Sequence, residues 1–120
     1  MSKIKKFIDP DIHFRVLHTL EENPHITQRE LAKKLGVSLG GVNYCLKALI
    51  DVGHIKMSNF QKNPNKSSYF YFLTPKGFSK KTNLATDFLR RKMVEYEALK
   101  IELDSIRLQV EKNNKNSEDF

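Results

Sequence analysis

The sequence predicts a mainly α-helical protein with one small β-hairpin and a long C-terminal helix. Three observations predict this class. Residues 27–53 form two short helical segments joined at Gly36, and glycine accepts the left-handed conformation in which many helices end. Residues 54–58 and 69–73 alternate in the manner of strands, and the second run is rich in aromatic residues. Residues 80–113 repeat apolar side chains at steps of four and three, as pairing helices do.

The first predicted helix begins at Asp9-Pro10, because a capping residue followed by proline is a common helix start. It should run to about Glu22, and Asn23-Pro24 should stop it. Its inward stripe is predicted to consist of Ile12, Val16, Leu17 and Leu20.

The next two helices form the central unit of the chain. Thr27 can cap the first of them, and Glu30 completes a capping box. Ser38 can cap the second, and Gly53 marks its end. One face of the second helix is predicted to be buried, and it consists of Val42, Leu46, Leu49 and Ile50. The opposite face carries small or hydrogen-bonding side chains and one cation, at Ser38, Gly40, Gly41, Asn43, Tyr44 and Lys47.

This pattern predicts a helix-turn-helix, whose second helix enters the major groove of DNA. Gly40 and Gly41 are unusual there, because glycine costs roughly 1 kcal/mol in a helix interior. Close approach to a phosphate or a base edge would account for them, and so would tight packing against another helix.

A hairpin after such a helix is a wing. The polar, basic stretch 61–68 should form its tip, with Lys62 and Lys66 near phosphates or in the minor groove; the alternative is a solvated loop. Phe70 and Phe72 share one face of the second strand, while Tyr69, Tyr71 and Leu73 share the other. The sequence does not decide which face is inward. We expect these aromatic residues to pack in the core rather than to stack on bases.

The C-terminal part is predicted to be a helix that pairs with a second copy. Thr74-Pro75 is a further helix start, and the long pattern runs from about residue 80 to 113. In a parallel pair, Glu95 faces Lys100 of the partner subunit and Glu102 faces Arg107 of the partner subunit. We therefore expect a parallel coiled coil and a homodimer. The seam includes Lys92 as an imperfect position, and its dimerisation residues are Leu89, Tyr96, Leu99, Leu103, Ile106 and Val110.

Val94, Ile101 and Leu108 form a second apolar row on this helix. A simple two-stranded coiled coil should be polar there, so the helix either buries a second face against another element or assembles beyond a dimer. The predicted organisation is a winged helix-turn-helix domain over residues 9–79, a dimerisation helix over 80–113 and a flexible tail over 114–120.

The charge is unevenly distributed along the chain. The net charge is +7, and residues 1–83 hold 14 Lys and Arg but only 6 Asp and Glu. No acidic residue lies between Asp51 and Asp87, although six lysines do. Beside a helix-turn-helix, such a stretch suits a phosphate backbone. A basic face kept for solubility is the alternative.

Several function classes have little support. No apolar run is long enough for a membrane span, and no hydrophobic segment for secretion is present, so we expect a cytoplasmic protein without membrane contact. One cysteine excludes an intramolecular disulfide. The four histidines show no ligand spacing, and no phosphate loop or nucleophile–base pair is visible, so neither metal, cofactor nor enzymatic activity is expected. Cys45 is read as a small packed residue, while the alternative of oxidant sensing needs an exposed thiolate.

The predicted partner is double-stranded DNA, bound by a homodimer at a near-palindromic site. Asn43 can pair with adenine and Lys47 can donate to guanine, while Gln28 and Arg29 should position the DNA backbone. The predicted contacts are Gln28, Arg29, Ser38, Leu39, Gly40, Asn43, Tyr44, Lys47, Lys62, Asn63, Asn65 and Lys66. The alternative function is a winged-helix module that binds a protein and no specific DNA.

The stretch LAKKLGVSLGGVNYCLKALIDVGHIKMSNF (residues 31–60), the aromatic strand and the motif LTPKG (residues 73–77) resemble the MarR superfamily of winged-helix regulators. More closely, residues 9–112 resemble the small MarR-type regulators associated with bacterial exopolysaccharide gene clusters. The resemblance implies a bacterial, cytoplasmic, dimeric transcription regulator of exopolysaccharide genes. Larger MarR proteins dimerise through helices at both ends, whereas only a short arm precedes the first helix here. No small-molecule effector is assigned.

Overall fold

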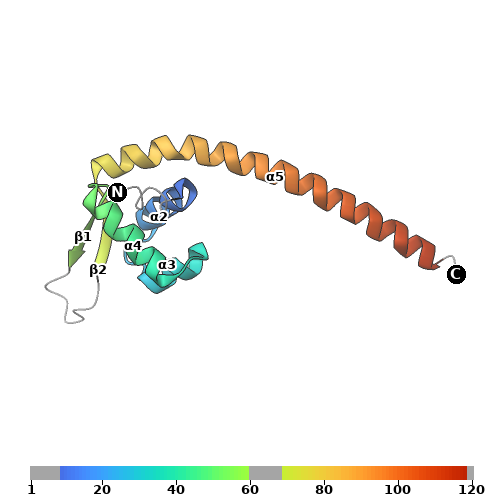
Figure 1. Cartoon of the computed structure of the whole chain (residues 1–120), viewed down its shortest axis with the longest axis horizontal. Coiled ribbons are helices and arrows are strands. Elements are labelled where there is room, and N and C mark those ends of the chain that lie inside the picture. Colours follow the sequence, from blue (N-terminus) through green and yellow to red (C-terminus); the bar gives the residue numbers. More distant parts are fainter. Residues whose placement is uncertain (1–8, 60–68, 119–120) are drawn as a thin grey trace. The chain divides into compact units, whose positions relative to one another are not determined.

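The computed structural model describes residues 9–59 and 69–118, in which four helices accompany a two-stranded antiparallel sheet (Figure 1). This confirms the predicted class, a winged helix-turn-helix fold with a long C-terminal helix. Residues 1–88 and 89–120 form two compact units. The elements are α2 (Pro10–Glu22), α3 (Gln28–Leu35), α4 (Leu39–Asp51), β1 (Ile55–Asn59), β2 (Tyr69–Leu73) and α5 (Pro75–Glu118).

The first three helices begin where the capping residues predict. The side chain of Asp9 accepts a hydrogen bond from the backbone N–H of Asp11 at 2.7 Å. Thr27 and Glu30 form the expected capping box, and Ser38 accepts from Gly41 N–H at 3.0 Å. Gly36 ends α3 with a φ of 69°, in the left-handed region. The helix boundaries are therefore set by local chemistry.

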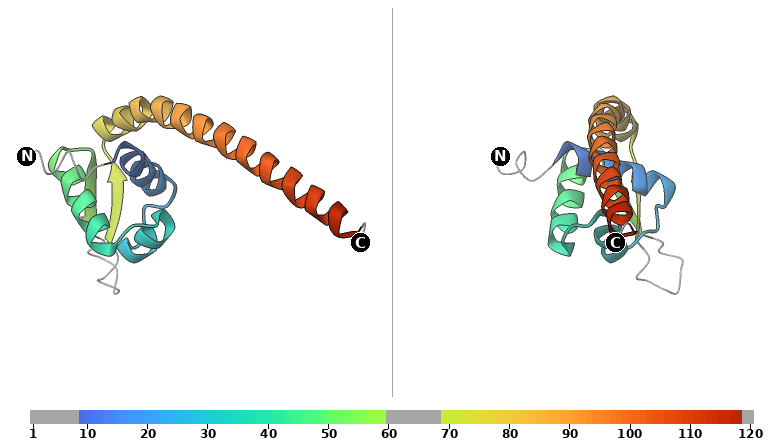
Figure 2. Two further views of the ribbon diagram at one scale, coloured as in Figure 1. Left: turned by 45° about the vertical axis from the view of Figure 1, so that its right-hand side comes forward. Right: turned by 90° about the vertical axis from the view of Figure 1, so that its right-hand side faces the viewer.

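The core of the first unit is formed by α2, α3, α4 and both strands. Val16, Leu17 and Leu20 of α2 are buried as predicted, and Ile12 is partly buried against them. β1 contacts α4 and β2 contacts α2, so the hairpin closes the core beside the helices (Figure 2). The buried cluster contains Val16, Leu17, Leu20, Ile26, Leu31, Ala32, Val42, Cys45, Leu46, Leu49, Ile55, Tyr71 and Leu73.

The inward face of α4 differs from the prediction at one position. Val42, Leu46 and Leu49 are buried, but Ile50 is 37% exposed. Cys45 and Ala48 are buried instead. Helical spacing places Ile50 at one edge of the apolar face and Cys45 and Ala48 at the other, so the elements packed against α4 cover the Cys45 edge rather than the Ile50 edge.

The hairpin resolves which face of the aromatic strand points inward. β1 and β2 pair antiparallel with Met57 opposite Tyr71, and β1 begins at Ile55, one residue later than predicted. Tyr71 and Leu73 are buried, whereas Phe72 is 39% exposed. The face with Tyr71 and Leu73 is therefore the inward one, and Phe72 lies on the outward face, which decides the choice that alternation left open.

Tyr71 joins β2 to the segment between α2 and α3. Its backbone N–H donates to the carbonyl of Pro24 at 3.1 Å. Its hydroxyl accepts a hydrogen bond from Nε2 of Gln28 at 3.1 Å. The start of α3 is thus fixed against the strand by a backbone contact and a side-chain contact.

The start of α5 is tied to the end of α4 through Thr74. The Thr74 N–H donates to the carbonyl of His54 at 3.0 Å, and its hydroxyl donates to the carbonyl of Gly53. The same hydroxyl accepts from Gly77 N–H at 3.0 Å. A Cβ on Gly77 would lie 1.9 Å from the carbonyl oxygen of His54. Only glycine allows this approach.

The last helix begins where Thr74-Pro75 predicts, and it extends beyond its predicted end. α5 begins at Pro75, and the Thr74 hydroxyl accepts from Gly77 N–H in its first turn, although the apolar repeat starts only at about residue 80. It continues to Glu118, so the predicted end at residue 113 is too early. The flexibility of residues 114–120 stays a prediction.

A stacked pair of histidines lies near the same junction. The rings of His13 and His54 are 5.4 Å apart with an interplanar angle of 29°, and both residues are buried. Burial, followed by the charges of His54 and Lys80, lowers the pKa of His13 to about 4. Burial, followed by Lys76 and Lys80, also lowers the pKa of His54. Both rings are therefore neutral in the folded protein at neutral pH.

We expect Gly77→Ala to lower the free energy of unfolding by about 1–3 kcal/mol or more, because the new Cβ overlaps the carbonyl of His54. Urea denaturation measures this. Gly40→Ala is the matched control, since its Cβ would meet nothing within 4 Å. Equal stability of the two variants would contradict the close approach at Gly77.

We expect stability to fall as the pH is lowered from 6.5 to 4. His13 in the unfolded chain binds a proton near its ordinary pKa of 6.5, whereas folded His13 does so only near 4. Between pH 4 and 6.5 the unfolded state therefore binds more protons than the folded state. The contribution of His13 to the free energy of unfolding is fully present only above pH 6.5. Thermal unfolding at pH 7.5 and 5 should show a smaller loss for His13→Gln than for the unsubstituted protein. An equal loss in His13→Gln and in the unsubstituted protein would contradict the role of His13.

Candidate nucleic-acid interface

α4 presents the predicted polar face to solvent. Asn43 and Lys47 are exposed one turn apart, and Tyr44 is 38% exposed. Leu39 at the start of the helix is 43% exposed. The opposite side of α4 is buried and contacts α3 and β1. The apolar side of α4 thus holds the helix in the domain, while its hydrogen-bond donors and acceptors face solvent. A helix arranged in this way can contact base edges in a DNA groove.

The two glycines of this helix have different environments. A Cβ on Gly40 would meet nothing within 4 Å, so packing against another helix does not account for that glycine. A Cβ on Gly41 would lie 3.1 Å from Oγ of Ser38, the atom that caps α4. Gly41 therefore protects the cap, whereas Gly40 leaves the surface open to a close neighbour.

The start of α3 carries two of the predicted contact residues in unlike settings. Arg29 is exposed. Gln28 is half-buried, and its amide donates to the hydroxyl of Tyr71. One N–H of the Gln28 side-chain amide is therefore used in a hydrogen bond within the domain. The sequence does not predict this bond.

The wing contacts predicted at Lys62, Asn63, Asn65 and Lys66 lie outside the described residues. On the described strands, Lys56 is exposed and pairs in register with Phe72. Lys76 at the start of α5 is also exposed, whereas Lys81 forms an ion pair with Glu21 of α2. The basic character of this part of the chain is therefore only partly neutralised.

Cys45 is packed inside the domain. It is 5% exposed, and burial raises the pKa of its thiol to about 11. At neutral pH the thiol is protonated and shielded, and both properties oppose reaction with oxidants. The geometry supports the interpretation of Cys45 as a core residue.

Residues 9–59 and 69–118 hold no group of three or more His, Cys, Asp or Glu arranged to bind a metal ion. Among the helices described, none combines the length and apolar character that a bilayer crossing requires.

The sequence missed two residues that position this interface. Alternation along β2 does not predict whether Tyr71 faces inward, and the hydrogen bond between its hydroxyl and Gln28 forms only because it does. The sequence predicts Gly77 only as a residue of the first turn of a helix. Its approach to the carbonyl of His54 is a tertiary contact with no local signal.

Residues 9–56 match a family described as winged helix-turn-helix DNA-binding domains. A comparison with curated proteins finds no match. The family match spans α2, α3, α4 and the start of β1, the part of the chain that contains the exposed face of α4.

Among solved structures, the chain is similar to regulators of the MarR family. The zinc-dependent MarR family regulator AdcR in its Zn(II)-bound state is 25% identical, with a TM-score of 0.54 over 74% of this chain and 58% of AdcR. ZitR from Lactococcus lactis in complex with DNA is 25% identical, with a TM-score of 0.56 over 74% of this chain and 58% of ZitR.

The transcriptional regulator SlyA is 21% identical, with a TM-score of 0.62 over 87% of this chain and 72% of SlyA. This likeness is one of fold. The chain spans less than two thirds of the length of AdcR and ZitR.

Proposed function

We propose that this chain is a DNA-binding transcription regulator of the MarR type that reads duplex DNA through α4. The observation that carries the proposal is the exposed polar face of α4 on a helix whose other side is buried. The family match over residues 9–56 and the likeness to ZitR, solved in complex with DNA, support it.

Each exposed residue of α4 has a role that its chemistry suits. Asn43 makes paired hydrogen bonds to adenine, and Lys47 donates to guanine. Leu39 contacts a thymine methyl group. Ser38 and Tyr44 bind phosphates or base edges, and the open surface at Gly40 lets the DNA backbone come close. Arg29 and the predicted wing residues contribute sequence-independent contacts to phosphates.

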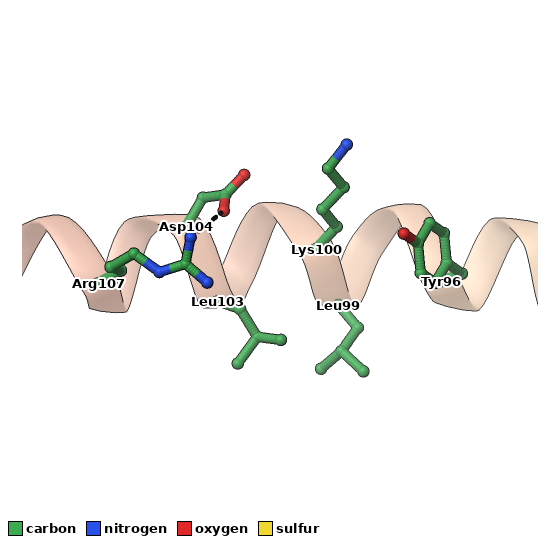
Figure 3. A pocket seen from close by; sticks show the side chains of 6 residues that line it. All are labelled: Tyr96, Leu99, Lys100, Leu103, Asp104 and Arg107. Atoms are coloured by element: carbon green, nitrogen blue, oxygen red, sulfur yellow. Dashed lines mark ion pairs between the residues drawn. The ribbon is translucent and has the colours of Figure 1, made fainter.

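We propose that the functional unit is a homodimer formed through α5. In the second unit the predicted seam is apolar and exposed, with Leu99 at 53%, Leu103 at 50% and Ile106 at 47%. Leu99 and Leu103 project to the same side of α5 (Figure 3). A parallel pair would cover this seam and place Glu95 near Lys100 of the partner subunit. Two recognition helices would then suit a near-palindromic site with half-sites about 34–36 Å apart.

The proposed targets are bacterial exopolysaccharide genes. This proposal is based on the resemblance of residues 31–60 and the LTPKG motif to regulators associated with exopolysaccharide gene clusters. A cytoplasmic location follows from this role. Binding of purified protein to genomic fragments, followed by sequencing of those retained, tests the target assignment. Fragments unrelated to polysaccharide synthesis would overturn it while leaving DNA binding intact.

We expect Asn43→Ala to reduce discrimination between a selected duplex and its scrambled version by about 1–3 kcal/mol, because it removes a base contact. Lys66→Ala should weaken both duplexes alike and flatten the salt dependence, because it removes a phosphate contact. Fluorescence anisotropy at two salt concentrations measures both effects.

Lys112→Ala is the charge control, since it removes the same charge from the C-terminal part of α5. It should leave both affinities nearly unchanged. If Asn43→Ala keeps the ratio of specific to scrambled binding, its assignment is wrong. If the unsubstituted protein binds neither duplex at low salt, the proposed function is wrong.

We expect Leu103→Asp to convert the dimer to a monomer in sedimentation equilibrium, because two carboxylates would meet within the apolar seam. Binding to a two-half-site duplex should weaken accordingly. Ile101→Asp is the matched control: it places the same charge on the other side of α5, where a dimer would keep it exposed. A dimer that survives Leu103→Asp would exclude the seam.

A further inference from the structure

A hydrogen bond between two side chains joins the start of α3 to β2, across 43 residues of sequence. Nε2 of Gln28 donates to the hydroxyl of Tyr71 at 3.1 Å, and the bond is partly buried. Tyr71 is 6% exposed, so its ring is fixed within the core, whereas Gln28 is half-buried. The bond therefore connects a side chain that cannot move to one that still reaches the surface.

The backbone is fixed on both sides of Gln28, the first residue of α3. Thr27 and Glu30 hold each other through the capping box, with bonds of 3.1 and 3.2 Å. Before the helix, the carbonyl of Pro24 accepts from the N–H of Tyr71 at 3.1 Å. The remaining freedom of Gln28 lies in its side-chain torsions, and the bond to the Tyr71 hydroxyl restricts these.

The amide of Gln28 keeps hydrogen-bonding capacity beyond this bond. A side-chain amide carries two N–H donors on one nitrogen, and Tyr71 uses one of them. Oxygens of a DNA phosphate accept hydrogen bonds from such donors. The next residue is the exposed Arg29, whose charge suits the same backbone. Because Tyr71 is fixed, the nitrogen of Gln28 and its second N–H are held in one orientation before DNA arrives.

We propose that Tyr71 is a positioning residue for DNA binding, whose hydroxyl orients the Gln28 amide so that its second N–H donates to a phosphate oxygen. This inference rests on the proposed function. A side chain that is ordered only on binding costs affinity, and the bond made in the free protein removes that cost. Gln28 is neutral and displaces no counterion, and a phosphate carries no base identity. The contribution of Tyr71 is therefore independent of both salt and DNA sequence.

The test compares Tyr71→Phe with the unsubstituted chain, because this change removes the hydroxyl and keeps the ring and the backbone bond to Pro24. Fluorescence anisotropy is measured with the selected and scrambled duplexes at two salt concentrations. We expect Kd to rise about two- to tenfold for both duplexes, by the same factor at both salt concentrations. Arg29→Ala should instead flatten the salt dependence, because it removes a charge.

Gln28→Met separates positioning from support of the fold. Both Tyr71→Phe and Gln28→Met lose the same hydrogen bond within the domain, but only Gln28→Met also loses the donor to DNA. We expect Gln28→Met to weaken binding more than Tyr71→Phe does, and we expect Tyr71→Phe to cause no further loss when it is added to Gln28→Met.

Ile55→Val is the stability control. It removes a methylene group from a residue of β1 that is 1% exposed, and it takes away no polar atom. It should lower the urea midpoint and leave both DNA affinities unchanged. Circular dichroism checks that each variant is folded at the temperature of the binding measurement.

Four results would overturn the inference while the unsubstituted chain binds DNA. They are unchanged affinity in Tyr71→Phe, equal losses in Tyr71→Phe and Gln28→Met, a further loss in the double variant, and a matching loss in Ile55→Val. The last three would mean that the hydroxyl acts on DNA binding only by supporting the fold. If the unsubstituted chain binds neither duplex, the proposed function fails, and this inference fails with it.

Discussion

Thr74 connects four elements of the winged helix-turn-helix unit through one buried set of hydrogen bonds. Its hydroxyl and N–H bind the carbonyls of Gly53 and His54, which follow α4, and its hydroxyl also accepts from Gly77 in the first turn of α5. A buried polar group left without a partner costs about 1–3 kcal/mol, so the loss of any one of these bonds would destabilise this junction. The end of α4, the start of β1, the end of β2 and the start of α5 therefore share one anchor.

Tyr71 supplies a second anchor, at the opposite end of the helix-turn-helix. Because its N–H binds Pro24 and its hydroxyl binds Gln28, β2 fixes the start of α3 while Thr74 fixes the end of α4. Because the start of α3 and the end of α4 are held at these two points, the exposed polar residues of α4 do not need to stabilise the fold. This separation explains how a helix with Gly40 and Gly41 near its start persists: tertiary packing, rather than helix propensity, holds it.

The parts of the fold that depend on neighbouring residues could be predicted from the sequence. Caps at Asp9, Thr27 and Ser38 act within three residues, and the structure confirms all three. Features that depend on tertiary contact could not. Alternation in β2 was clear, but whether Phe72 or Tyr71 faced inward depended on which side the helices covered. The exposed polar face of α4 could be predicted, because burial of the apolar side of the helix leaves only one orientation for the opposite side. The contacts that this face would make with DNA depend on the bound duplex, so the sequence alone does not give them.

The buried thiol of Cys45 gives α4 an internal reporter. It is the sole cysteine of the sequence and lies in the middle of α4 on the core side. A thiol reagent reaches it only when the helix separates from the domain, so the labelling rate reports the free energy of that local opening. DNA bound across the outer face of α4 would oppose the same opening from the other side. Slower labelling in the presence of a duplex would then measure how far a bound ligand rigidifies the domain, without any change to its sequence.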